Sequence, residues 1–214
     1  MKILSIASAF PLFTCFVLLS LLLMYNIKKN TRKNKQKVED FWARERLANS
    51  TRRKPLDTVE YIRIPIEDLP MELEAQDPII ADCIKQIIEL KDEPIANFTG
   101  LTNTDLKLEY GAPNITHLSK CDSDFTILAR TLQDWAKRLH ELGHDDEAIS
   151  ILEFAIKNRS DVSASYYLAA MIYAANDNDR KIAWLKRTAD TLSSAIKPSI
   201  IRTLNEKYPD IQAY

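Results

Sequence analysis

The sequence predicts an all-α chain, in which one N-terminal transmembrane helix precedes a cytosolic domain of antiparallel helices. Three observations lead to this prediction. The 214 residues include only three glycines, fewer than β-barrels and parallel α/β folds use in their turns and phosphate loops. Residues 3–25 carry no charge. From residue 123 onward, apolar residues recur at helical spacing and short polar breaks separate the segments.

The uncharged run predicts a transmembrane anchor over residues 3–26. As a helix, residues 3–25 extend roughly 35 Å, which is enough for a hydrocarbon core of ~30 Å. The main alternative is a cleaved signal peptide, because Ala7-Ser8-Ala9 matches the small-residue pattern of a cleavage site. Most of the apolar run follows that pattern instead of preceding it, which favours an anchor that stays in the mature protein.

A basic segment follows the uncharged run. Residues 28–54 contain eleven cations and three acids, a net charge of +8, whereas residues 55–214 contain 17 cations and 27 acids, a net charge of −10. The positive-inside bias then predicts a single-pass protein of the cell membrane with its C-terminal domain in the cytosol. Six cations are expected to contact the membrane surface: Lys28, Lys29, Arg32, Lys33, Lys35 and Lys37. The acidic domain argues against a nucleic-acid partner.

The middle of the chain predicts less regular structure. Residues 27–54 are expected to form a basic juxtamembrane helix or linker, and residues 55–122 a mixed linker with one helix over about 78–91. Thr102 and Asp105 have the spacing of a capping box, which predicts a short helix over about 103–110. The rest of 95–121 is expected to be a loop, whose role the sequence leaves open.

Residues 123–208 predict a domain of five helices joined by short connections, so neighbouring helices are expected to be antiparallel. The expected ranges are about 124–142, 146–158, 162–175, 179–194, and a fifth helix that starts at Pro198 and stops before Pro209.

A period of 34 residues is visible in this domain. The first unit has large and small apolar residues at fixed spacings: Leu132, Trp135, Ala136, Leu139, Gly143, Ala148, Leu152 and Ala155. The pattern recurs at Tyr166, Ala169, Ala170 and Tyr173. Residues 124–194 therefore resemble tetratricopeptide repeats, with 198–208 as a capping helix. The alternative is a plain antiparallel bundle with coincidental spacing. The whole chain also resembles uncharacterised bacterial membrane-anchored helical proteins, which implies no activity.

In tetratricopeptide proteins the first helix of each repeat lines a concave groove that binds peptides. The resemblance implies five groove positions here: Gln133, Lys137, Tyr167, Met171 and Arg202. Only Lys137 and Arg202 suit the family's clamp for a terminal carboxylate, so that clamp is in doubt. About three repeats normally form a full groove, so partial packing of these residues against one another is expected.

One motif suggests a different chemistry. His140-Glu141-Leu142-Gly143-His144 has the H-E-x-x-H form of zinc metallopeptidases, in which both histidines bind zinc from one helix and the glutamate is the general base. The flanking charges and Gly143 indicate a helix end instead. A third zinc ligand is also missing, because Glu147 and Ser150 stand at the positions where the extended motif needs glycine and histidine.

The sequence as a whole predicts a membrane-anchored cytosolic adaptor or scaffold, not an enzyme. Its expected partners are the lipid bilayer and an unidentified protein or peptide, with no nucleic acid, no small-molecule substrate and no cofactor. The alternatives are a membrane-bound zinc metallopeptidase that uses His140, Glu141 and His144, and a structural subunit of a membrane complex. The sequence leaves the partner, the pathway and the oligomeric state open.

Overall fold

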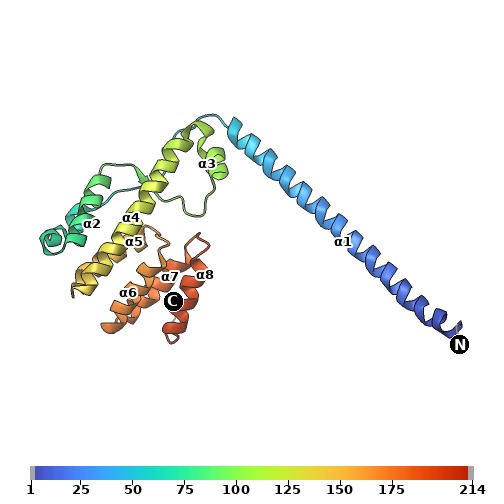
Figure 1. Cartoon of the computed structure of the whole chain (residues 1–214). Coiled ribbons are helices and arrows are strands. Elements are labelled where there is room, and N and C mark those ends of the chain that lie inside the picture. Colours follow the sequence, from blue (N-terminus) through green and yellow to red (C-terminus); the bar gives the residue numbers. More distant parts are fainter. Residues whose placement is uncertain (1–2, 212–214) are drawn as a thin grey trace. The chain divides into compact units, whose positions relative to one another are not determined.

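The chain is represented by a computed structural model that describes the backbone of residues 3–211 and their side chains except those of 3–14, 32–33 and 74–76. The described residues form eight α-helices and one two-stranded sheet, so the all-α prediction is confirmed. The chain divides into two units, one ending at Thr51 and one beginning at Arg52 (Figure 1).

The first unit is a single helix, α1 (Ile3–Ser50). It includes most of the basic juxtamembrane helix or linker expected over residues 27–54. The transmembrane helix predicted over 3–26 is wrong: in the described part of the chain, no helix is long and apolar enough to cross a membrane. The side chains of residues 3–14 lie outside the described set.

Of the six cations expected at a membrane surface, the structure describes the side chains of four. Lys28, Lys29, Lys35 and Lys37 are exposed on α1. Those of Arg32 and Lys33 lie outside the described side chains.

The second unit begins with short elements around two small helices. These are β1 (Tyr61–Ile62), two 3₁₀ turns η1 (Ile66–Asp68) and η2 (Met71–Gln76), α2 (Pro78–Leu90), β2 (Ile95–Ala96), α3 (Asn103–Tyr110) and η3 (Ala112–Asn114). The strands pair antiparallel, with Tyr61 opposite Ala96. The helices predicted over 78–91 and 103–110 are confirmed as α2 and α3, and the capping box of Thr102 and Asp105 is present.

Five helices complete the unit, and they confirm the predicted helices: α4 (Ile115–Glu141), α5 (Asp145–Lys157), α6 (Ser163–Ala175), α7 (Asp179–Asp190) and α8 (Lys197–Lys207). Each helix packs against the next, and α6 also contacts α4 and α8. Helix α4 lies between α2 and α5 (Figure 1). A continuous core of apolar side chains joins α2 to α4–α8 and centres on the fully buried Trp135 and Tyr166.

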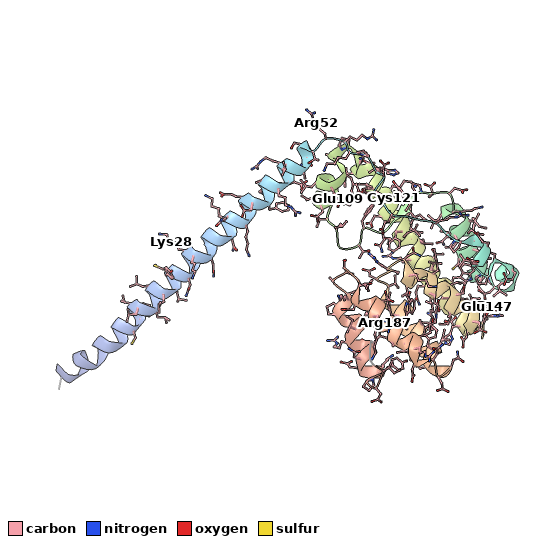
Figure 2. The ribbon with its side chains drawn as sticks, turned by 180° about the vertical axis from the view of Figure 1, so that it is seen from behind. Lys28, Arg52, Glu109, Cys121, Glu147 and Arg187 are labelled. Carbon is pink, nitrogen blue, oxygen red and sulfur yellow. The ribbon has the colours of Figure 1, made fainter. Side chains whose placement is uncertain are left out.

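Helix α7 ends at Asp190, four residues before the expected end at 194, and two further stretches differ from the prediction. Helix α4 starts nine residues before position 124, because Leu118 and Cys121 complete a second apolar cluster with Leu106 and Tyr110 of α3. Cys121 is labelled in Figure 2. Residues 67–77, which belong to the mixed linker expected over 55–122, include η2 and bury Leu69 and Leu73. In both stretches, contacts between residues distant in sequence stabilise structure that the local sequence pattern does not predict.

Candidate binding groove

Helix α2 is fixed against α4 at its N-terminus. Asp77 caps α2, because its carboxylate accepts hydrogen bonds from the backbone N–H groups of Ile79 (2.9 Å) and Ile80 (3.4 Å). The same carboxylate accepts a hydrogen bond from Nη2 of Arg138 on α4, at 2.6 Å. Asp77 therefore joins the start of α2 to the end of α4. Arg138 is the main cause of its lowered pKa.

A second side-chain hydrogen bond between the two helices lies about two turns further along α2. The hydroxyl of Thr131 on α4 donates a hydrogen bond to Oε1 of Gln86 on α2, at 2.8 Å. Since residue numbers rise on α2 as they fall on α4, the two helices are antiparallel.

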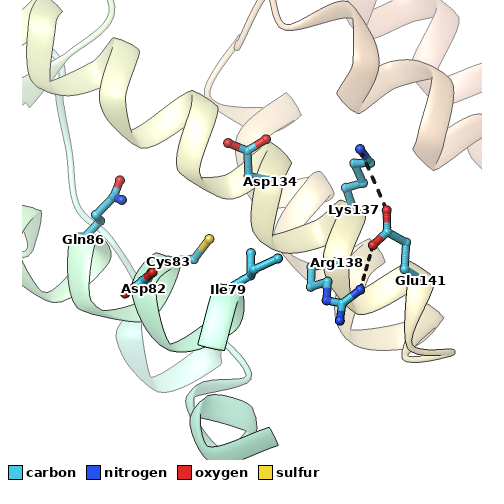
Figure 3. Close-up of a pocket in the computed structure, with 8 residues that line it drawn as sticks. All are labelled: Ile79, Asp82, Cys83, Gln86, Asp134, Lys137, Arg138 and Glu141. Atoms are coloured by element: carbon cyan, nitrogen blue, oxygen red, sulfur yellow. Dashed lines mark hydrogen bonds and ion pairs between the residues drawn. The ribbon is translucent and has the colours of Figure 1, made fainter. Parts of the chain in front are cut away.

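Between these two interhelical contacts, α2 and α4 leave a cavity of about 350 Å³, which we call the α2–α4 groove (Figure 3). Its lining residues are Ile79, Asp82, Cys83, Gln86, Asp134, Lys137, Arg138 and Glu141.

The cations of the groove are already paired. Glu141 accepts a hydrogen bond from Nη1 of Arg138 at 3.0 Å and lies 3.8 Å from Nζ of Lys137 (Figure 3). Asp77 and Glu141 both raise the pKa of Arg138. In contrast, Asp82 and Asp134 are exposed and make neither a hydrogen bond nor an ion pair within the described residues. The groove therefore holds two carboxylates without a charged partner.

The groove also has apolar surface. Ile79 remains 50% exposed, so it offers apolar surface to the groove. Cys83 is 6% exposed, and Figure 3 shows its sulfur directed toward α4. Burial, together with the nearby carboxylates of Asp134, Asp82 and Asp77, raises the pKa of the Cys83 thiol to about 11. The thiol is therefore neutral at physiological pH.

The five groove positions implied by the tetratricopeptide resemblance lie at different places. Gln133 is buried and accepts a hydrogen bond from the Ser165 hydroxyl of α6, at 2.6 Å. Tyr167 donates a hydrogen bond to the Thr203 hydroxyl of α8, at 3.3 Å. The ammonium group of Lys207 lies over the Tyr167 ring, 5.9 Å from its centroid.

The other three are exposed. Lys137 lines the α2–α4 groove, Met171 is 47% exposed on α6, and Arg202 lies 3.9 Å from Glu206 on α8. Gln133 and Tyr167 thus hold neighbouring helices together, and the structure does not gather the five side chains into one surface.

The H-E-x-x-H segment spans a turn between two helices. Helix α4 ends at Glu141, Gly143 has φ of +85°, and α5 begins at Asp145. His140 is 2.5 Å from the Asp145 carboxylate, and His144 is 3.8 Å from that of Glu147. The two histidines therefore do not share the continuous helix that the zinc motif requires. Among the described residues, no group of three or more potential ligands is placed to hold a metal.

A second charged cluster joins α5 to α6 and α7. Glu153 of α5 accepts hydrogen bonds from the Tyr173 hydroxyl, at 2.7 Å, and from Lys181, and it pairs with Lys157 at 3.0 Å. The ammonium group of Lys181 also makes cation–π contacts with the rings of Tyr173 and Trp184. Although burial alone would raise the pKa of Glu153, these donors lower it to about 2.

Sequence reasoning identified only Lys137 among the groove residues as a binding candidate. Ile79, Cys83 and Ile88 lie at helical spacing on the apolar face of the helix predicted over 78–91. The apolar face of α2 is too wide for its neighbours to cover completely, because Ile79 and Ile88 at its edges remain half exposed. The width of the stripe was the available signal that part of α2 faces solvent.

Comparison of the chain with family models, with curated proteins and with solved structures finds no match.

Proposed function

We propose that the domain that starts at Arg52 is a protein-interaction module, which binds a peptide or protein segment in the α2–α4 groove. One observation carries this proposal: a solvent-facing cavity combines a half-exposed Ile79 with two carboxylates that lack a charged partner within the described part of the chain. Apolar surface beside a few polar groups that fix orientation is typical of binding pockets.

The arrangement of α4–α8 supports a scaffold role. Consecutive helices pack together, and the alternate helices α4, α6 and α8 also touch, as expected of tetratricopeptide-like repeats. Lys186 stands 34 residues after Leu152, at a repeat position where an apolar residue is expected, and it is 6% exposed. Its Nζ donates hydrogen bonds to the backbone carbonyls of Tyr208 and Ile211, at 2.6 Å each. At this repeat position, Lys186 thus hydrogen-bonds to the backbone that follows α8.

The size of the groove limits what it binds. A cavity of about 350 Å³ is near the lower end of ligand pockets, which span roughly 300–1,000 Å³. It accommodates one or two side chains of a partner, while the rest of the partner lies on the surrounding surface. Such a pocket suits an anchoring residue of the kind that dominates binding energy at interfaces.

The proposal is tested by selecting peptides from a random displayed library against the full chain. Their affinities are then measured for the natural chain, for Ile79→Ser and for the matched control Ile88→Ser. Both isoleucines are half exposed on α2, but only Ile79 lines the groove. Loss of the apolar contact at Ile79 is expected to weaken binding about tenfold, with little change in the control.

Two results contradict the proposal. Peptides that bind both variants as well as the natural chain place the binding site elsewhere. A library that yields no peptide, although circular dichroism shows a folded chain, excludes peptide capture by this domain.

A further inference from the structure

We infer that the α2–α4 groove recognises an arginine or lysine side chain in a basic segment of its partner. This inference rests on the proposed function and names the chemistry of the same site.

The charges of the groove determine the sign of the occupant. Lys137 and Arg138 already face Glu141, and Arg138 also binds Asp77. Asp82 on α2 and Asp134 on α4 have no charged partner among the side chains that the structure describes. A guanidinium or ammonium group bound in the groove would supply positive charge beside these carboxylates, and the fork of arginine can bond to more than one carboxylate oxygen.

The apolar part of the groove suits the rest of such a side chain. Arginine and lysine carry a charged head on an aliphatic stem, which packs on apolar surface while the head stays polar. Ile79 offers a half-exposed surface for that stem. Cys83, which is nine-tenths buried and makes no hydrogen bond among the described side chains, presents a protonated thiol from the groove floor.

An acidic or neutral occupant fits the groove less well. An acidic side chain would meet Asp82 and Asp134, and it would have to displace Glu141 to reach Arg138. A neutral side chain would desolvate the two carboxylates without compensation, which is unfavourable. Residues 55–214 carry a net charge of −10, so the surrounding field also attracts a basic segment.

The test uses three acetylated and amidated pentapeptides that differ at the centre: Gly-Leu-Arg-Leu-Gly and its citrulline and glutamate counterparts. Citrulline keeps the shape of arginine and removes the charge. Each peptide is titrated into the isotope-labelled full chain, and amide shifts on α2 and α4 give the dissociation constant. The arginine peptide is expected to bind about tenfold more tightly than the citrulline peptide, because charge-assisted hydrogen bonds are about twice as strong as neutral ones.

Two double variants locate the effect. Asp82→Asn with Asp134→Asn is expected to weaken the arginine peptide about tenfold and to leave the citrulline peptide unchanged. Asp57→Asn with Asp92→Asn removes the same net charge from exposed positions outside the groove, so it controls for long-range attraction.

Other outcomes overturn the inference in distinguishable ways. Equal binding of the arginine and citrulline peptides in the groove, insensitive to Asp82 and Asp134, excludes cation recognition and leaves peptide capture intact. Preference for the glutamate peptide makes Lys137 and Arg138 the determinants instead. If no pentapeptide shifts α2 or α4, the inference fails. The proposed function then fails too only if the library-selected peptides also do not depend on Ile79.

Discussion

The α5–α7 cluster around Glu153 and the α2–α4 groove both bring charged side chains from neighbouring helices together, but they differ in how completely the charges are matched. Around Glu153, two lysines and a tyrosine hydroxyl surround one carboxylate, which is 17% exposed. In the groove, two carboxylates stand exposed beside cations that have other partners. A cluster that is satisfied internally stabilises the fold, whereas an unmatched one is available to a partner.

The largest effect is expected at Glu153. Glu153→Gln removes the charge that pairs Lys157 and Lys181, and it leaves a weaker acceptor for the Tyr173 hydroxyl. The free energy of unfolding is expected to fall by about 1–3 kcal/mol, as measured by chemical denaturation. The control is Glu89→Gln, an exposed position on α2, for which a change below about 0.5 kcal/mol is expected. A loss of equal size in both variants would contradict the difference between the two clusters.

The same substitution has a signature in pH. The pKa of Glu153 is lowered from 4.5 to about 2 by folding, so its ionised form stabilises the fold above pH 4.5. That contribution is lost as the pH falls from 4.5 toward 2. The stability of Glu153→Gln is therefore expected to decline less steeply than that of the natural chain in this window, and parallel curves would exclude the assigned role.

A smaller loss of stability is expected at Asp77, which lies beside the groove and links α2 to α4. Asp77→Ala removes both the cap of α2 and the partner of Arg138. The melting temperature is expected to fall by about 2–4 °C. Asp77→Asn keeps a capping side chain and loses the charge, so it is expected to restore part of the loss. If asparagine is no better than alanine, the ion pair and not the cap holds the start of α2.

The smallest effect is expected from the carboxylates that we assign to binding. Asp82→Asn and Asp134→Asn, alone or together, are expected to change the free energy of unfolding by less than about 0.5 kcal/mol, since both side chains are exposed. Thermal denaturation of the full chain measures this directly. A substantial destabilisation would show that these residues support the fold and would weaken their assignment to a partner.

The local pattern predicted most of the helices but not their contacts. Capping by Thr102, Pro78 at the start of α2 and Gly143 between α4 and α5 are local features, so they are visible in the sequence. The early start of α4 depends on Leu118 and Cys121 meeting α3, and the order of residues 67–77 depends on burial of Leu69 and Leu73. Such long-range contacts leave no periodic signal.

The groove illustrates the same limit. Lys137 was a candidate from its repeat position, but Asp82 and Asp134 read only as polar residues on amphipathic helices. Their meeting depends on the antiparallel pairing of α2 with α4, which Asp77, Arg138 and Gln86 establish across about 45–61 residues of sequence.

The sequence by itself determined the all-α class, the basic segment, the acidic domain and the helices from α2 to α8, because helix periodicity, caps and charge are properties of neighbouring residues. Tertiary structure alone decided that α2 packs on α4 and that Ile79 stays exposed. It also decided that, among the described side chains, two carboxylates of the groove have no charged partner. The physical reason is that burial and charge pairing depend on which helix faces meet, and side chains distant in the chain determine that choice.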